Sequence, residues 1–86
     1  MERKEHFKKL SEFFNVLSEG SVAVKADDHI FHFIAQPEST NCDVKAFKKG
    51  ARSVEEIGKK LPLHEYIGII NELIRDTHGK LTISKL

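Results

Sequence analysis

Residues 63–77 form the most apolar part of the chain, and the rest of the fold has to bury them. Their apolar side chains recur at helical spacing but cover an arc wider than one packed face requires. These side chains are Leu63, Tyr66, Ile67, Ile69, Ile70, Leu73 and Ile74. His78 and Gly79 follow as a typical helix end. We therefore expect a helix that is either covered on two sides or keeps an apolar edge for a second molecule.

Residues 3–19 predict another helix, with one apolar side. Their large apolar residues fall at the i, i+3, i+4 spacing that lines one side of a 3.6-residue helix. They are Phe7, Leu10, Phe13, Phe14 and Leu17. Gly20 follows where a left-handed glycine commonly ends a helix.

Two short β-rich runs follow, at residues 22–24 and 30–35. The Asp27-Asp28 pair between them favours a tight turn, because aspartate can hydrogen-bond its own backbone, so the runs predict a hairpin. Residues 36–42 are polar, contain Pro37 and predict a loop. Residues 81–86 alternate in polarity and predict a short final strand.

Residues 44–61 also show helical spacing of apolar positions, and two interpretations compete. The positions are Val44, Phe47, Ala51, Val54, Ile57 and Leu61. Asp43 could cap one long helix, or Gly50 could break it, with Ser53 and Glu56 forming a capping box for a second helix. We favour the broken version, because glycine costs about 1 kcal/mol in a helix interior. Pro62 favours a boundary at its preceding residue.

These elements predict a single α+β domain over residues 1–86, with a three-stranded sheet and helices packed on one face. A chain of 86 residues buries only about 60 to 65% of its unfolded surface, so its stability as a monomer is marginal. A short sheet also leaves unpaired edges, which proteins usually cover or pair with another chain. We therefore expect a homodimer.

The charge is divided unevenly along the chain. Residues 1–43 carry a net charge of −3 and residues 44–86 a net charge of +4. On a helix, Lys45, Lys48, Lys49 and Arg52 would share the side opposite the apolar positions. Such a face suits an acidic partner or a phosphate backbone. The alternative is an ordinary solvated face that needs no partner.

Nucleic-acid binding is the second hypothesis for the same basic stretch. A helix at residues 53–60, a turn and a second helix before a final strand would resemble the end of a winged-helix domain, over about a third of the chain. The second helix, however, offers Glu65, Glu72 and Asp76 against a single fixed cation, Arg75, which suits DNA poorly. Exposed aromatic residues for stacking bases are also scarce.

The sequence contains no convincing catalytic or metal-binding pattern. His29 and His32 would lie on opposite faces of a strand and could not bind one metal ion together. Cys42 is the only cysteine, and a thiol enzyme that uses it with a histidine is our third hypothesis. No glycine-rich phosphate loop follows a predicted strand. We expect a protein that is not an enzyme and that has no metal or cofactor.

We therefore expect a small interaction or regulatory module that forms a homodimer and binds a macromolecular, acidic protein partner. The residues expected to self-associate are Tyr66, Ile69, Leu73 and Leu86. Those expected to contact the partner are Lys45, Lys48, Lys49 and Arg52. No apolar run approaches the ~20 residues that cross a bilayer, so we expect a cytoplasmic protein without a membrane partner.

Overall fold

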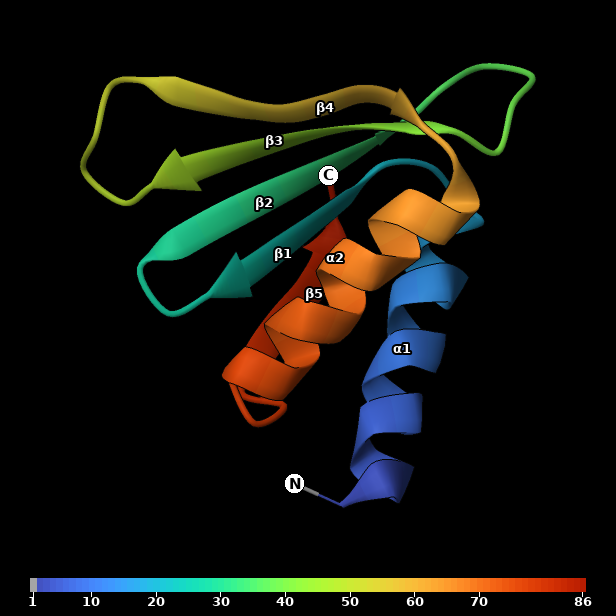
Figure 1. Cartoon of the computed structure of the whole chain (residues 1–86), viewed down its shortest axis with the longest axis vertical. Helices are drawn as coiled ribbons and strands as arrows, with labels where there is room; N and C mark the ends of the chain where they lie inside the picture. The colour runs from blue at the N-terminus through green and yellow to red at the C-terminus, as the bar shows by residue number, and fades with distance from the viewer. Residues whose placement is uncertain (1) are drawn as a thin grey trace.

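The structure, a computed structural model, describes residues 2–86 and consists of a five-stranded antiparallel sheet with two helices on one face (Figure 1). In chain order the elements are α1 (Arg3–Leu17), β1 (Val22–Ala26), β2 (His29–Ala35), β3 (Cys42–Lys48), β4 (Val54–Leu61), α2 (Leu63–Asp76) and β5 (Leu81–Lys85). The strand order across the sheet is β4-β3-β2-β1-β5. The C-terminal strand β5 therefore lies beside β1.

The α+β class is as expected, but the prediction of a three-stranded sheet with helices at residues 44–61 is wrong. These residues belong to β3 and β4, which pair with each other, while β3 also pairs with β2. Gly50 does interrupt the segment, but it lies in a turn between two strands, with a φ of 86° that favours glycine. Ser53 and Glu56 accordingly do not begin a helix.

The strand β3 is held by the sheet because alternate residues face opposite sides. Cys42, Val44 and Ala46 are buried, whereas the residues between them are only half-buried. In the strand conformation, β3 buries one row of side chains and forms backbone hydrogen bonds with two neighbouring strands. These two gains outweigh the helical spacing of its apolar residues, which on its own would fit a helix equally well. The predicted hairpin turn at Asp27 and Asp28 is present.

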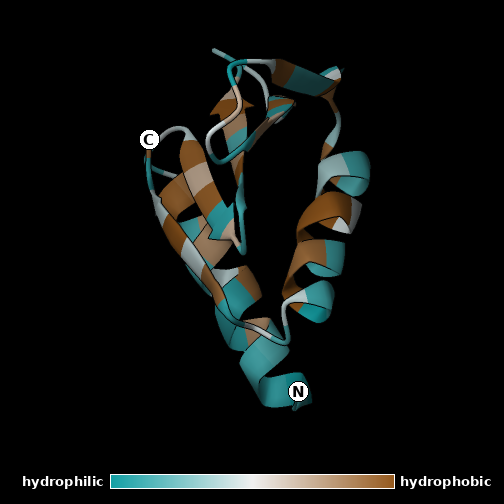
Figure 2. Ribbon diagram, turned by 90° about the vertical axis from the view of Figure 1, so that its left-hand side faces the viewer, coloured by the Kyte–Doolittle hydropathy of each residue, from teal (hydrophilic) through white to brown (hydrophobic). Residues whose placement is uncertain are grey.

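The hydrophobic core lies between the sheet and the two helices. In Figure 2 the brown, hydrophobic side of α2 is turned toward the sheet. Phe33 of β2 is fully buried at the centre, with ring centroids 4.9 Å from Phe13 of α1 and 6.5 Å from Tyr66 of α2. These edge-on aromatic contacts join both helices to the sheet.

The wide apolar arc of α2 packs against other parts of the same chain on two sides. Ile70 and Ile74 are fully buried in the core, and Ile69 and Leu73 pack against it while half-buried. The helix α1 lies alongside α2 and also contacts β5. Neither of these two helices has the length and apolar character needed to cross a bilayer.

Candidate functional site

The face of the sheet opposite the helices is not covered by any helix of residues 2–86, and we call it the open face (Figure 2). Directly paired residues of neighbouring antiparallel strands share a face, so the strand register identifies its members. They are Ala23, Lys25, Ile30, His32, Ile34, Asp43, Lys45, Phe47, Val54, Glu56, Thr82 and Ser84. The open face thus crosses all five strands.

The open face carries several apolar side chains. A solvated face of an antiparallel sheet is usually polar, because only its other face packs on the core. Here Ile30 and Phe47 are directly paired, Val54 pairs with Phe47 from the other side, and Ile34 lies further along β2. Val54 is 50% exposed and the other three are half-buried. An apolar stripe therefore runs across β2, β3 and β4.

Two rings lie against each other on the open face. The centroids of His32 and Phe47 are 4.5 Å apart. Burial, and then the positive charge of Lys45, lower the pKa of the His32 imidazole below its usual value. His32 is therefore mainly neutral at pH 7 and extends the apolar stripe instead of adding a charge to it.

The charges of the open face are of both signs. Lys45 and Glu56 are directly paired across β3 and β4, and Lys25 lies on β1. The Asp43 carboxylate accepts a hydrogen bond from the backbone N–H of Lys60 at 2.7 Å, beside the irregular pairing of β3 with β4. The open face can therefore complement a surface that carries both charges.

The four cations expected to form one helical face do not share a helix, because that helix does not exist. Lys45 lies on the open face, whereas Lys48 pairs with His29 on the helix-facing side. Lys49 and Arg52 are exposed in the turn between β3 and β4. The prediction that they contact a partner stays a prediction, and any such contact would involve a hairpin tip and a strand.

The residues expected to self-associate occupy different environments. Tyr66 is 2% exposed and donates a hydrogen bond of 2.7 Å to the carbonyl oxygen of Thr40. Ile69 and Leu73 pack partly against the core, and Leu86 is 53% exposed. Self-association stays a prediction, but three of these four side chains already have packing partners in their own chain.

Cys42 lies in the core beside Tyr66 and is 1% exposed. Burial raises the pKa of its thiol, and the neighbouring Tyr66 phenol opposes this only in part. A pocket of about 320 Å³ adjoins both residues and has largely apolar walls, including Phe14 and Leu63. The thiol of Cys42 thus lies beside a phenol, whereas the hypothesis of a thiol enzyme requires a base beside the nucleophile.

The histidines of β2 point to opposite faces, as their spacing predicted. His29 lies on the helix-facing side, where its Nδ1 is 2.8 Å from the Asp28 carboxylate, and His32 lies on the open face. Within the described part of the chain, no three His, Cys, Asp or Glu residues gather as a metal-binding group.

The apolar residues of the open face were missed by sequence reasoning, although a signal was present. Ile30, His32 and Ile34 alternate with Phe31 and Phe33, so both faces of this strand are apolar. A strand that is apolar on both faces indicates packing on two sides.

Comparison of the chain with protein-family models, with curated proteins and with solved structures finds no match. What the protein does has to be inferred from the chemistry of its own surfaces.

Proposed function

We propose that the chain is a small, non-enzymatic interaction module that forms a homodimer through the open face of its sheet. The observation that carries this proposal is the apolar stripe of Ile30, Ile34, Phe47 and Val54 on a face that no helix of residues 2–86 covers. Burying it removes apolar surface from water, at about 25 cal/mol for each Å². Dimer formation would also add buried surface to a domain of marginal size.

A second copy of the chain is the occupant that the charges favour. In a two-fold dimer the same patch meets itself, so a patch of one sign would repel its copy. The open face carries Lys25 and Lys45 together with Glu56, which allows opposite charges to meet. The molecule measures 32 by 32 Å along its two long axes, enough for the ~800 Å² that each partner buries in a standard interface.

We also propose that the module works in the cytoplasm, where the single Cys42 would remain a thiol. Lys48, Lys49 and Arg52, near the tip of the β3–β4 hairpin, are exposed cations and could contact an acidic protein partner while the open face is occupied. Such a partner would give the module its regulatory role.

Replacing Phe47 with lysine is expected to weaken the dimer at least tenfold, because loss of a central interface residue commonly costs about 2 kcal/mol or more. The new ammonium group would be buried against the same face of the partner copy. Sedimentation equilibrium over a wide range of protein concentrations measures the dissociation constant of both proteins.

Phe7→Lys is the matched control, because Phe7 is 56% exposed on α1, away from the open face. It should leave the dissociation constant unchanged, and circular dichroism should show that both variants fold. A wild-type protein that stays monomeric at about 100 µM would contradict the proposal, as would equal effects of the two substitutions.

Single-stranded nucleic acid is a second candidate partner for the open face, favoured by the adjacent rings of His32 and Phe47 beside Lys45. Sheet faces with aromatic rings bind unpaired bases by stacking, and lysines contact the phosphates. Binding of an oligonucleotide should then weaken with salt, with a log-log slope of about −0.7 per phosphate neutralised.

Under this second proposal, Lys45→Gln should make the salt slope shallower by about 0.7. Phe47→Ala should weaken binding by about tenfold without changing that slope, because stacking releases no counterions. Fluorescence anisotropy with a labelled oligonucleotide measures both quantities. No binding at low salt would exclude this function.

A further inference from the structure

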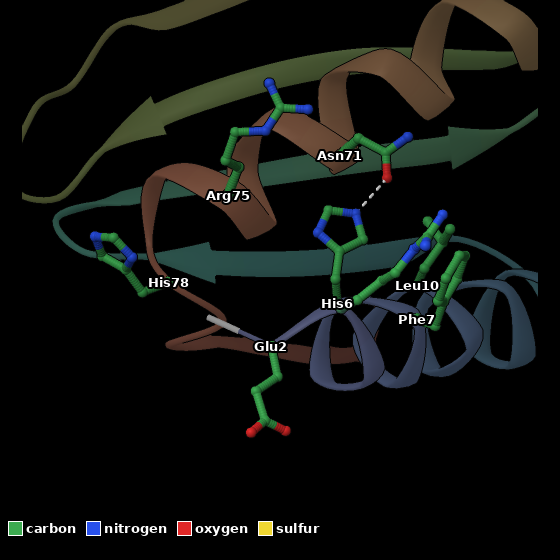
Figure 3. A pocket seen from close by; sticks show the side chains of 8 residues that line it. Glu2, His6, Phe7, Leu10, Asn71, Arg75 and His78 are labelled. Carbon is green, nitrogen blue, oxygen red and sulfur yellow. Dashed lines mark hydrogen bonds between the residues drawn. The ribbon is translucent and has the colours of Figure 1, made fainter.

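A second surface feature lies far from the open face, between the first turns of α1 and the end of α2. It is a pocket of about 660 Å³. Its lining includes Arg3 of α1. Figure 3 labels further lining residues, among them His6 and Phe7 from α1 and Asn71, Arg75 and His78 from α2 and the turn after it. Side chains that are about 65 residues apart in sequence therefore meet here only through the packing of the two helices.

The pocket gathers cations that have no anionic partner in the chain. The ion pairs among residues 2–86 involve Lys9, His29 and Lys59, so neither Arg3 nor Arg75 is paired with a carboxylate in the described part. Both arginines are exposed, as is His78. An arginine keeps its charge at any physiological pH. Two fixed positive charges thus border one concave surface.

His6 is held at the centre of this group. Its Nε2 donates a hydrogen bond of 2.8 Å to the Oδ1 of Asn71, which can only accept, so the ring orientation is fixed. Figure 3 shows the other ring nitrogen directed toward the open space between Arg75 and His78. The one acidic residue of the lining, Glu2, turns its carboxylate away from His6.

An apolar wall adjoins the cationic group. Phe7 is 56% exposed, which is unusual for a phenylalanine, and Leu10 lies beside it in the lining. The pocket is also much larger than a single inorganic anion requires, and its volume falls within the roughly 300–1,000 Å³ of small-molecule sites. The walls therefore suit a ligand with an anionic end and an apolar body.

We infer that this pocket binds a small phosphate monoester whose organic group is an aromatic ring. The planar guanidinium groups of Arg3 and Arg75 match the oxygens of a phosphate. The organic ring lies against Phe7. Two fixed cations suit a phosphate dianion better than a carboxylate, which carries a single charge.

Phenyl phosphate is the probe that tests this inference, followed in ¹⁵N-resolved NMR spectra of the full chain. It should shift the resonances of Arg3, His6, Asn71 and Arg75 and leave the open face unaffected. Inorganic phosphate should shift the same residues but bind more weakly, because it lacks the ring. Benzoate should bind at least tenfold more weakly than phenyl phosphate.

Substitutions test the cationic group and the apolar wall of the pocket separately. Arg75→Gln should weaken binding of phenyl phosphate and of inorganic phosphate by about tenfold or more, the range expected for a lost hydrogen bond to a charged group. Phe7→Ala should weaken phenyl phosphate and leave inorganic phosphate unchanged. Arg52→Gln removes an exposed cation of the β3–β4 turn and is the matched control, expected to have no effect.

If Arg75→Gln and Arg52→Gln weakened binding of phenyl phosphate equally, binding would depend only on the overall charge of the protein, and the inference would be overturned. Benzoate that binds as tightly as phenyl phosphate would overturn the assignment to phosphate. So would an absence of shifts around His6 and Asn71 at a probe concentration of about 10 mM, well above the KM values of typical enzymes.

Discussion

Phe33→Ala is expected to lower the free energy of unfolding by about 3–5 kcal/mol, the usual cost of truncating a buried phenylalanine. Phe33 is 0% exposed and lies between Phe13 of α1 and Tyr66 of α2. Its loss would leave a cavity where the two helices meet the sheet. Because domains are stable by only about 5–15 kcal/mol, this loss is a large fraction of the total stability. Urea titration followed by circular dichroism measures the loss.

Phe7→Ala is the matched control for this effect, since it makes the same chemical change at a side chain that is 56% exposed. Surface substitutions usually change stability by no more than about 0.5 kcal/mol. If Phe7→Ala proved as costly as Phe33→Ala, α1 would not pack on the sheet through the side that carries Phe13.

The helices could be predicted from sequence because their apolar spacing has one interpretation. Residues 3–17 and 63–76 repeat it over three or more turns, without a competing row of alternating apolar residues. The segment from residue 44 to residue 61 is different, because Val44 and Phe47 fit a helix while Cys42, Val44 and Ala46 fit a strand. The pairing of β3 with β2 decides between the helix and the strand. This pairing depends on residues outside the segment, so the pattern of residues 44–61 alone does not predict it.

The two candidate sites also differ in how far the sequence alone could predict them. The open face could have been anticipated from β2 alone, since both of its residue rows are apolar. Its extent could not, because Phe47 and Val54 join it only once β3 and β4 are known to be strands. The pocket between α1 and α2 was beyond local reasoning altogether. Nothing near His6 in the sequence indicates that it will meet Asn71.

Stability is also expected to fall as the pH rises from 10 to 12, with Tyr66 as one cause. Burial, and then the neighbouring Cys42, raise the pKa of the Tyr66 phenol from 10.0 to about 12. The folded protein therefore holds this proton more tightly than the unfolded chain does. The resulting stabilisation is fully present below pH 10 and is lost as the pH rises through 12. A shift of this size corresponds to about 2–3 kcal/mol.

Comparison with Tyr66→Phe isolates this contribution, because the other titrating groups are common to both proteins. At pH 8 the variant should be less stable by about 1 kcal/mol, having lost the hydrogen bond to Thr40. By pH 12 the order should reverse, since only the wild type then has a buried phenol to ionise. Urea midpoints at several pH values measure the difference, and a Cys42→Ala background removes the coupled thiol. A difference that stays constant with pH would mean that Tyr66 titrates alike in the folded and unfolded chains, and that its burial does not hold the proton.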